Sequence, residues 1–258
     1  MNLTIESIKN HIHNKSISIE TYACIPSTNT LLKERGRKGA PHGLLIAAEE
    51  QTAGRGRMGR SFFSPAETGV YFSILLRPTL PPESCQLITT AAAVACARVL
   101  ESISGTDAKI KWVNDIYIHD KKVCGILTEA AFSAVGTLDF AVLGIGINIT
   151  PPKDNFPMDL IQKAGAILDD TTTDLRGYII AEVVNEFLKL YETLEDRSYF
   201  DEYRKRSMLD GMAIEVIRNN EIIPATAIFI DEELRLAVQY ADGKIEHLYT
   251  GDVSIRKA

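Results

Sequence analysis

A loop rich in glycine and arginine constrains this chain more than any other segment. Residues 51–62 read QTAGRGRMGRSF and stand between two apolar segments that we expect to be buried strands. The glycine spacing matches the GxGxxG dinucleotide fingerprint, but no helical pattern follows Gly59, and Ser64-Pro65 interrupts the chain soon afterwards. The segment also lacks the GxxxxGK[ST] pattern of a phosphate-binding P-loop. The sequence therefore argues against a Rossmann-type dinucleotide fold and against a P-loop NTPase.

The loop carries three arginines, Arg55, Arg57 and Arg60, and no acidic residue. Guanidinium groups pair with carboxylates and phosphates through two parallel hydrogen bonds, and glycines let a backbone approach a ligand closely. We therefore interpret the loop as one that closes over an anion. The alternative is a solvated basic loop or one that contacts RNA. The whole chain has 28 Lys and Arg against 34 Asp and Glu, a net charge of −6, which argues against a general nucleic-acid coat.

A second polar cluster lies in residues 109–129, KIKWVNDIYIHDKKVCGILTE. Strict alternation along the strand that we expect after Lys121 would place Lys122 on one face with Cys124 and Ile126. A lysine among apolar side chains predicts a buried anionic partner, whereas a lysine at the strand entrance would face water. The candidate functional residues of this cluster are Lys111, Asn114, Asp115, Lys122 and Gly125.

Two weaker signals flank these clusters. Ser27, Thr28 and Asn29 stand at the start of a predicted helix, where hydroxyl and backbone N–H groups bind a polar ligand or simply cap the helix. Residues 144–148, GIGIN, put two glycines late in an apolar strand, which indicates close approach of a ligand or a neighbouring chain segment. Asn148 offers a hydrogen bond at the end of that strand.

Hydrophobic periodicity predicts an α+β fold, in which a mixed sheet flanked by helices precedes a small C-terminal β domain. We expect one helix that begins at Ser27 or Thr28, and others at 4–13, 84–103 and 174–195. The expected strands of the larger part are 43–48, 69–76, 115–119, 122–129 and 137–149, with Asp120-Lys121 in the turn of a hairpin. The expected strands of the smaller part are 213–218, 225–230, 234–240 and 245–249. We place the two domains at 1–207 and 208–258.

Several classes of protein are disfavoured by what the sequence lacks. The four cysteines form no CxxC pair, no HExxH occurs, and no cluster of side chains spells out a metal site. The first residues, MNLTIESIKNHIHN, lack the apolar core of a signal peptide, and no apolar stretch approaches the ~20 residues that span a bilayer. We therefore expect a cytoplasmic protein that does not act at a membrane.

Taken in order, the segments STN, GRGRMGR, KWVND, KKVCGI and GIGIN resemble the signature blocks of the biotin–protein ligase family. The resemblance implies a catalytic domain related to class II aminoacyl-tRNA synthetases and a C-terminal SH3-like barrel. It implies an enzyme that uses ATP and Mg²⁺ to activate biotin as biotinyl-5′-AMP. The biotin is then transferred to a lysine of a biotin carboxyl carrier protein, for example that of acetyl-CoA carboxylase. Two positions depart from the family pattern: Val113 replaces a frequent proline, and Phe62 replaces an aromatic residue that is often tryptophan.

The resemblance also implies roles for individual residues. Arg57 and Lys122 would bridge the biotin carboxylate and the α-phosphate, and Asp115 would act as the general base in the transfer. The implied catalytic residues are Arg57, Lys111, Asp115 and Lys122. The implied biotin-binding residues are Ser27, Thr28, Asn29, Gln51, Gly54, Arg55, Gly56, Arg57, Lys122 and Gly125. The implied ATP-binding residues are Arg55, Arg57, Arg60, Phe62, Lys111, Asn114, Lys122 and Asn148.

The sequence also bears on the partners of the protein and on alternative functions. Only 26 residues precede the STN segment, too few for a three-helix DNA-binding unit, so we expect a ligase without operator binding. The resemblance leaves open whether the chain forms a homodimer. A lipoate or octanoate ligase is the alternative enzyme, since it activates an acid in the same way. A nucleic-acid-binding module that uses the GRGRMGR loop is the alternative from another class.

Overall fold

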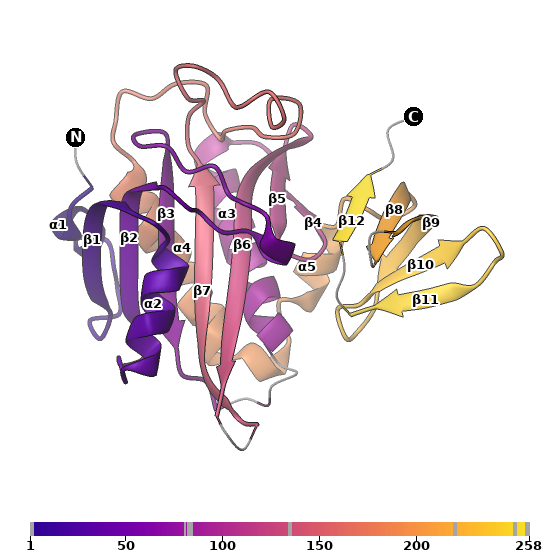
Figure 1. Ribbon diagram of the computed structural model, residues 1–258, viewed down its shortest axis with the longest axis horizontal. Helices are drawn as coiled ribbons and strands as arrows, with labels where there is room; N and C mark the ends of the chain where they lie inside the picture. The colour runs from indigo at the N-terminus through magenta and orange to yellow at the C-terminus, as the bar shows by residue number, and fades with distance from the viewer. Residues whose placement is uncertain are drawn as a thin grey trace.

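The computed structural model describes residues 3–79, 81, 85–133, 136–218, 221–249 and 252–255, and a seven-stranded sheet forms its larger part (Figure 1). The strand order is β1-β2-β3-β7-β6-β5-β4. β1 and β2 are parallel, and every other neighbouring pair in this sheet is antiparallel. The predicted mixed sheet is therefore confirmed. Its strands are β1 (Ser18–Ile25), β2 (Leu44–Gln51), β3 (Gly69–Leu76), β4 (Lys109–Lys111), β5 (Asp115–Ile118), β6 (Lys121–Phe132) and β7 (Leu138–Asn148).

Helices cover both faces of this sheet (Figure 1). α2 (Thr28–Arg37) packs on one face, where Leu32 and Phe140 lie in a small apolar cluster. The larger core lies on the opposite face, beneath α3 (Cys85–Ser104) and α4 (Arg176–Glu192). The remaining helices are the short α1 (Ile5–Lys9) and α5 (Phe200–Lys205) and the 3₁₀ turns η1 (Arg57–Gly59) and η3 (Leu194–Asp196).

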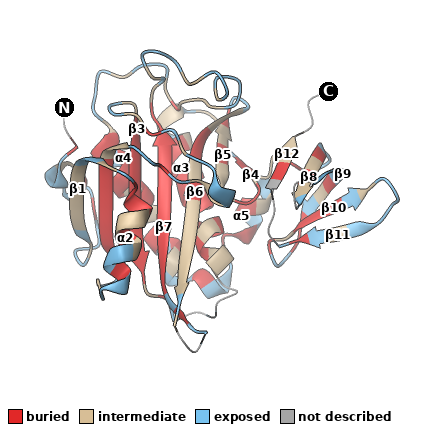
Figure 2. Cartoon of the chain, viewed as in Figure 1, coloured by how far each residue is buried: buried red, intermediate tan, exposed pale blue. Residues whose placement is uncertain are grey.

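Within the described residues, α3 is the one helix long and apolar enough to cross a membrane, and 67% of that stretch is buried inside the fold. Its alanines at 91–93, 95 and 97 are fully buried, so small side chains allow it to pack closely against the sheet and α4. Figure 2 shows buried residues concentrated in the central strands that lie over this helix. The apolar character of α3 is therefore that of a core helix.

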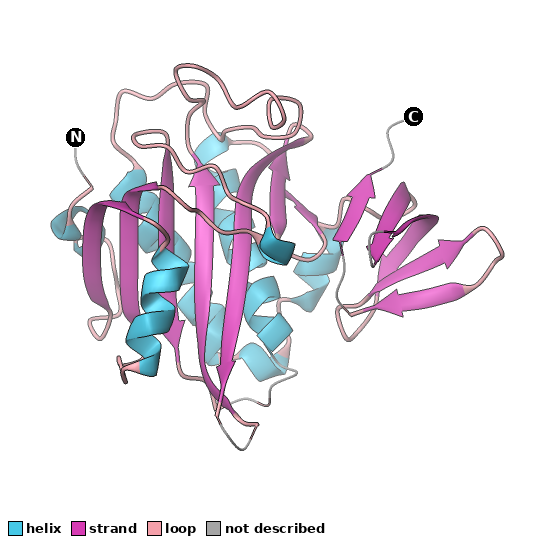
Figure 3. Ribbon diagram, in the orientation of Figure 1, coloured by secondary structure: helices cyan, strands magenta, loops and turns pink. Residues whose placement is uncertain are grey.

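A second, five-stranded antiparallel sheet forms the C-terminal part and contains no described helix (Figure 3). Its order is β11-β10-β9-β8-β12. Two donors from the larger part reach one carbonyl of this unit, because Trp112 Nε1 lies 2.8 Å and Gln86 Nε2 3.0 Å from the Leu234 oxygen. The strands are β8 (Ala213–Arg218), β9 (Glu221–Ile230), β10 (Leu236–Tyr240), β11 (Ile245–Leu248) and β12 (Asp252–Ile255).

The hairpin between β5 and β6 differs from the prediction. Its two turn residues are His119 and Asp120 rather than Asp120 and Lys121, because Ile118 pairs with Lys121. Both turn residues have positive φ, 50° and 58°, as the primed two-residue hairpin turns require.

A bulge in β6 also overturns the predicted alternation. Lys122 pairs with Tyr117, and Cys124 pairs with the preceding residue of β5, Ile116, so Val123 is the extra residue. Lys122 therefore does not share a face with Cys124. Both Val123 and Cys124 are fully buried, whereas Lys122 is half-buried and turns to the face that carries α2. The sequence analysis also missed β1, β4 and β12.

Candidate active site

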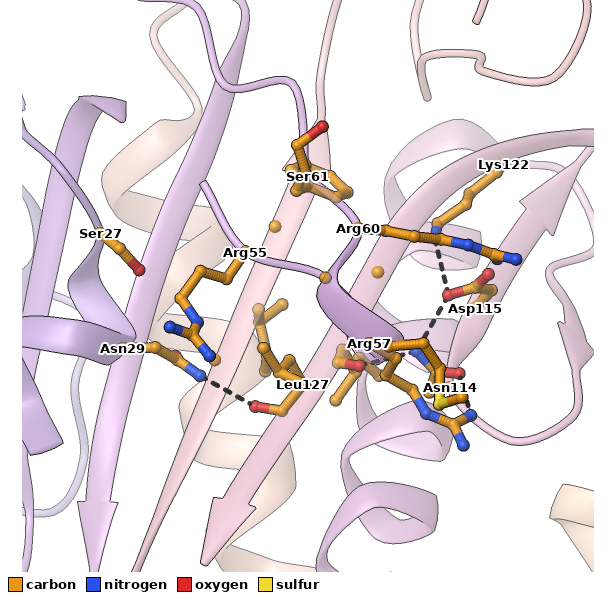
Figure 4. Close-up of a pocket in the computed structure, with 18 of the residues that line it drawn as sticks. Ser27, Asn29, Arg55, Arg57, Arg60, Ser61, Asn114, Asp115, Lys122 and Leu127 are labelled. Carbon is orange, nitrogen blue, oxygen red and sulfur yellow. Dashed lines mark hydrogen bonds and ion pairs between the residues drawn. The ribbon is translucent and has the colours of Figure 1, made fainter. Parts of the chain in front are cut away.

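A cleft on the α2 face of the large sheet brings the predicted residues together (Figure 4). The cleft has a volume of about 930 Å³, which includes space that is open to solvent. The start of α2 and the end of β2 form one end of the cleft, the 54–62 loop crosses it, and β5, β6 and β7 form its floor. Among the predicted site residues, those that line it are Ser27, Thr28, Asn29, Gln51, Arg55, Gly56, Arg57, Arg60, Phe62, Lys111, Asn114, Asp115, Lys122 and Gly125.

The 54–62 loop folds back on itself as a narrow hairpin. Phe62 N donates to Gly54 O at 2.9 Å, and Gly56 N donates to Arg60 O at 2.7 Å. A Cβ on Gly54 would lie 2.3 Å from the Phe62 oxygen, so this tight closure requires glycine. Gly54 thus shapes the loop and does not line the cleft. At the tip, Met58 has a φ of 55° and its side chain is 74% exposed.

One end of the cleft is polar and carries buried hydroxyl and amide groups. Ser27 caps α2, and Thr28 N donates to Gln51 Oε1 at 2.9 Å. The hydroxyl of Ser73 on β3 donates to Asn29 Oδ1 at 2.6 Å and lies 2.7 Å from the Thr28 hydroxyl. The sequence analysis missed Ser73, although a lone serine within the apolar strand GVYFSILL was the available signal.

The opposite end is cationic. Arg57 Nη1 donates to Asn114 Oδ1 at 2.9 Å, and Asn114 Nδ2 donates to Asp115 Oδ1 at 3.1 Å. Lys122 Nζ lies 2.8 Å from the same Asp115 oxygen, so the side chains of Arg57, Asn114, Asp115 and Lys122 form one connected group (Figure 4). Burial lowers the pKa of Arg57, and burial also lowers the pKa of Lys111 although the nearby Asp115 opposes the shift. These cations are therefore poorly hydrated and suited to an anionic ligand.

Three glycines make the floor between the two ends. Gly125 and Gly146 are paired across β6 and β7, and a Cβ on Gly146 would lie 2.5 Å from the Phe62 ring. A Cβ on Gly144 would lie 1.9 Å from Asn29 Oδ1. The Phe62 ring therefore rests on bare backbone, and Asn29 has space only because residue 144 lacks a side chain. The implied role of Phe62 in ATP binding, in which its ring would stack on the purine, stays a prediction.

The structure leaves Asn148 outside the cleft lining. It is 8% exposed, and its Nδ2 donates to Gly165 O at 2.8 Å, which ties the segment after β7 to the sheet. Gly144 and Gly146, the two glycines singled out in GIGIN, line the cleft. Besides Ser73, the residues that sequence reasoning missed are Met58, Ser61, Trp112, Ile126, Leu127, Ile145 and Val253, which line the cleft, and Glu129, which binds Arg55. Trp112 and Val113, whose peptide bond is cis, lie within the segment that carries the cationic end.

The described residues hold no group of three or more His, Cys, Asp or Glu side chains that could bind a metal ion. Of the described side chains that line the cleft, Asp115 is the one carboxylate. Mg²⁺ in nucleotide sites is commonly held by one or two carboxylates together with substrate phosphates. The donor set therefore fits a Mg²⁺ ion that arrives with a nucleotide, and Asp115 and Asn114 are the oxygen donors near it.

Comparisons with known proteins show the family and the fold of this chain. A model of the biotin/lipoate A/B protein ligase family matches residues 21–148. The chain is 31% identical over 238 residues to the bifunctional ligase/repressor of Bacillus spizizenii, across 90% of this chain and 72% of that protein. It is 28% identical over 248 residues to the biotin–[acetyl-CoA-carboxylase] ligase of Mycobacterium tuberculosis, across 91% and 88%. The biotin protein ligase of Aquifex aeolicus, solved with biotin and ATP, superposes with a TM-score of 0.76 at 24% identity, across 93% and 99%.

The α+β architecture is thus the fold of solved biotin protein ligases. The chain belongs to the biotin/lipoate A/B protein ligase family.

Proposed function

We propose that this protein is an ATP-dependent ligase that joins biotin to a lysine of a biotin carboxyl carrier protein, such as that of acetyl-CoA carboxylase. One observation carries the proposal: a single cleft joins a neutral polar end to an end with four cations, Arg57, Arg60, Lys111 and Lys122. Biotin has a neutral polar ring system and a carboxylate, and it suits both ends. Relatives named as biotin ligases, and a similar structure solved with biotin and ATP, support the same substrates.

The first half-reaction activates the acid. The ring system of biotin binds at Ser27, Thr28, Asn29 and Gln51, whose hydroxyl and amide groups suit its ureido group. Arg57 and Lys122 hold the carboxylate against the α-phosphate of ATP, because two anions meet only when cations lie between them. A carboxylate oxygen attacks the α-phosphorus, the bond to pyrophosphate breaks, and biotinyl-5′-AMP remains.

Binding of ATP falls to the cationic end. Arg60 closes over the phosphates, Arg55 closes over the ligand from the polar end of the cleft, and Lys111 and Asn114 contact a phosphate or its Mg²⁺. Bound Mg²⁺ would neutralise phosphate charge. The proposed role of Asn148 in the nucleotide site depends on movement of the segment that it now binds through Gly165.

The second half-reaction transfers biotin to the acceptor lysine. A free lysine with a pKa of ~10.4 is almost entirely protonated at pH 7. Asp115, which lies in the cleft beside Lys122, takes the proton from the amine as it attacks the carbonyl carbon, and AMP leaves. The carrier protein therefore has to present its lysine at the Asp115 end of the cleft.

The predicted domain boundary, location and lack of operator binding are compatible with this function. We propose a domain boundary after residue 207 and an SH3-like barrel built on β8–β12, of which the described strands form a sheet with β11 and β12 at its edges. Cytoplasmic location and the absence of operator binding stay predictions, and the sequence leaves homodimer formation open. A DNA mobility-shift assay and sedimentation with and without biotin and ATP test the last two.

The function is tested by incubation with ATP, Mg²⁺, biotin and a purified carrier domain, followed by mass spectrometry of the carrier. We expect biotin on one lysine. Biotin, lipoate and octanoate are offered separately in ATP–pyrophosphate exchange as the matched comparison. Exchange with lipoate or octanoate but not with biotin would overturn the proposal in favour of the alternative acid ligase.

A further inference from the structure

A half-buried carboxylate outside the cleft lining connects three parts of the site. Glu129 lies on β6, and its side chain is only 14% exposed. Lys33 Nζ donates to its Oε1 at 2.8 Å and Arg55 Nη2 to the same atom at 3.2 Å, while Asn29 Nδ2 donates to Oε2 at 3.0 Å. Two of these donors come from α2 and one from the 54–62 loop.

The carboxylate is ionised in this setting. Burial alone would raise the pKa of Glu129, but the hydrogen bonds from Lys33 and Asn29 and the charge of Arg55 lower it below its ordinary value. An ionised, half-buried acid with three donors holds its partners more firmly than a surface ion pair does.

Glu129 helps to orient the Asn29 amide. The Nδ2 atom of Asn29 donates to Glu129 Oε2 at 3.0 Å and to the Leu127 carbonyl at 3.3 Å, and the Oδ1 atom accepts from Ser73. The two ends of the amide are therefore assigned by different partners, and the amide has one favoured orientation toward the polar end of the cleft.

Glu129 also anchors the loop at the end opposite to Arg57. Arg55 reaches Glu129 across the floor of the cleft, whereas Arg57 reaches Asn114 at the cationic end. Arg55 is half exposed, and among the described residues Glu129 is its one acidic partner. The position of the loop over the polar end thus depends on this contact.

Glu129 also makes the two ends of the cleft differ in net charge. At the polar end, the negative charge of Glu129 offsets one of the two positive charges of Lys33 and Arg55. At the other end, Asp115 stands against four cations, so positive charge is in greater excess there. The carboxylate of an incoming substrate is therefore drawn toward Arg57 and Lys122.

We propose that Glu129 is a positioning residue that holds Arg55, and with it the 54–62 loop, over the cleft. It also helps to orient the Asn29 amide toward the uncharged ring system of the substrate. The identity of that substrate rests on the proposed function, whereas the position of the loop does not.

The test compares Glu129→Gln with Glu186→Gln in the full-length protein. Glu186 on α4 also accepts from an arginine and a lysine, Arg98 and Lys189, but it lies away from the cleft, so its loss controls for the loss of a similar ion-pair cluster. Limited trypsin digestion without ligands is read by mass spectrometry at the bonds after Arg55, Arg57 and Arg60. We expect cleavage there to rise about tenfold in E129Q, because proteolysis follows the population of the opened loop, and to stay unchanged in E186Q.

Kinetics give the second measurement. In biotin-dependent ATP–pyrophosphate exchange, we expect E129Q to raise the KM for biotin about tenfold and to change kcat less than about twofold, since Glu129 acts on positioning and not on the reacting atoms. Loop cleavage at the wild-type rate in E129Q would overturn the proposal. Increased cleavage together with absence of biotin-dependent exchange in the wild type would support the anchor and refute the proposed function.

A second variant keeps the test valid if E129Q folds poorly. Arg55→Gln leaves Glu129 bound to Lys33 and Asn29, so the carboxylate stays paired. We expect cleavage after Arg57 and Arg60 to rise as in E129Q, and the double variant to show no further rise, because both changes break the same contact. Additive increases in the double variant would contradict the anchor.

Discussion

Lys122 Nζ lies 2.8 Å from Asp115 Oδ1, an ion pair that joins β6 to β5 within a cleft whose other charged side chains are cations. Asn114 donates to the same carboxylate oxygen. Asp115 therefore orients one of the cations assigned to the acid and is itself held in position.

Replacement of Asp115 by alanine should leave formation of the adenylate largely intact and slow the transfer of biotin to the carrier lysine. Loss of a general base costs about 10²–10⁴ in rate. Single-turnover transfer from preformed biotinyl-5′-AMP measures the effect, and biotin-dependent ATP–pyrophosphate exchange serves as the control. If both half-reactions fell equally, Asp115 would not be the base.

Replacement of Arg57 by alanine should suppress the first half-reaction instead. Its guanidinium is held by Asn114 at the cationic end, and loss of one such charge-stabilising donor costs about 10²–10³ in kcat. ATP–pyrophosphate exchange is the measurement. Arg218→Ala is the matched control, because Arg218 pairs with Glu246 in the C-terminal sheet, away from the cleft. An exchange rate equal to that of the wild type would refute the bridging role.

The Gly144→Ala variant should weaken biotin binding more than ATP binding. The added methyl group would lie 1.9 Å from Asn29 Oδ1, so the amide has to leave the place set by Ser73 and Glu129. We expect the Kd for biotin to rise about tenfold or more, and overpacking of this kind to cost about 1–3 kcal/mol of stability. Calorimetric titration of each ligand separates the two sites, and unchanged biotin affinity would show that Asn29 does not contact the vitamin.

The sequence predicted the parts of this site that local patterns encode. The arginine loop and β3, which matches the expected range 69–76, follow from runs of one kind of residue. The group around Asp115 follows from a dense set of polar residues, although the bulge at Val123 was invisible to a strict alternation rule. That bulge is the physical reason why Lys122 faces the cleft while Cys124 stays in the core.

Residues whose role depends on register between distant strands were not predictable. Ser73 and Glu129 acquire their partners only because β3, β7 and β6 are neighbours and α2 lies across them. Asn148 lies in a motif that was singled out, yet it binds a carbonyl 17 residues further along the chain. The sequence also predicts a turn at Asn219-Asn220 between the first two C-terminal strands, and these two residues lie outside the described part of the chain.

As pH rises, the rate of adenylate formation should fall at a lower pH than it would if Lys111 had the pKa of an exposed lysine. Burial lowers the pKa of Lys111, with Lys122, Arg60 and Lys163 adding to the shift and Asp115 opposing it. As pH rises through this lowered pKa, Lys111 loses its charge and its attraction for a phosphate before a lysine of pKa ~10.4 would.

As pH rises, the contribution of Lys111 to the free energy of unfolding changes in the opposite direction to its contribution to activity. The folded protein binds this proton less tightly than the unfolded chain does, so the contribution of Lys111 to stability rises with pH between its folded and unfolded pKa values. Loss of activity in this range is therefore not loss of fold. A pH profile of ATP–pyrophosphate exchange for the wild type and for Lys111→Arg, with thermal unfolding at each pH, separates the two. Because arginine keeps its charge, the alkaline decline should move to higher pH in K111R, and coincident profiles would exclude Lys111 as the titrating group.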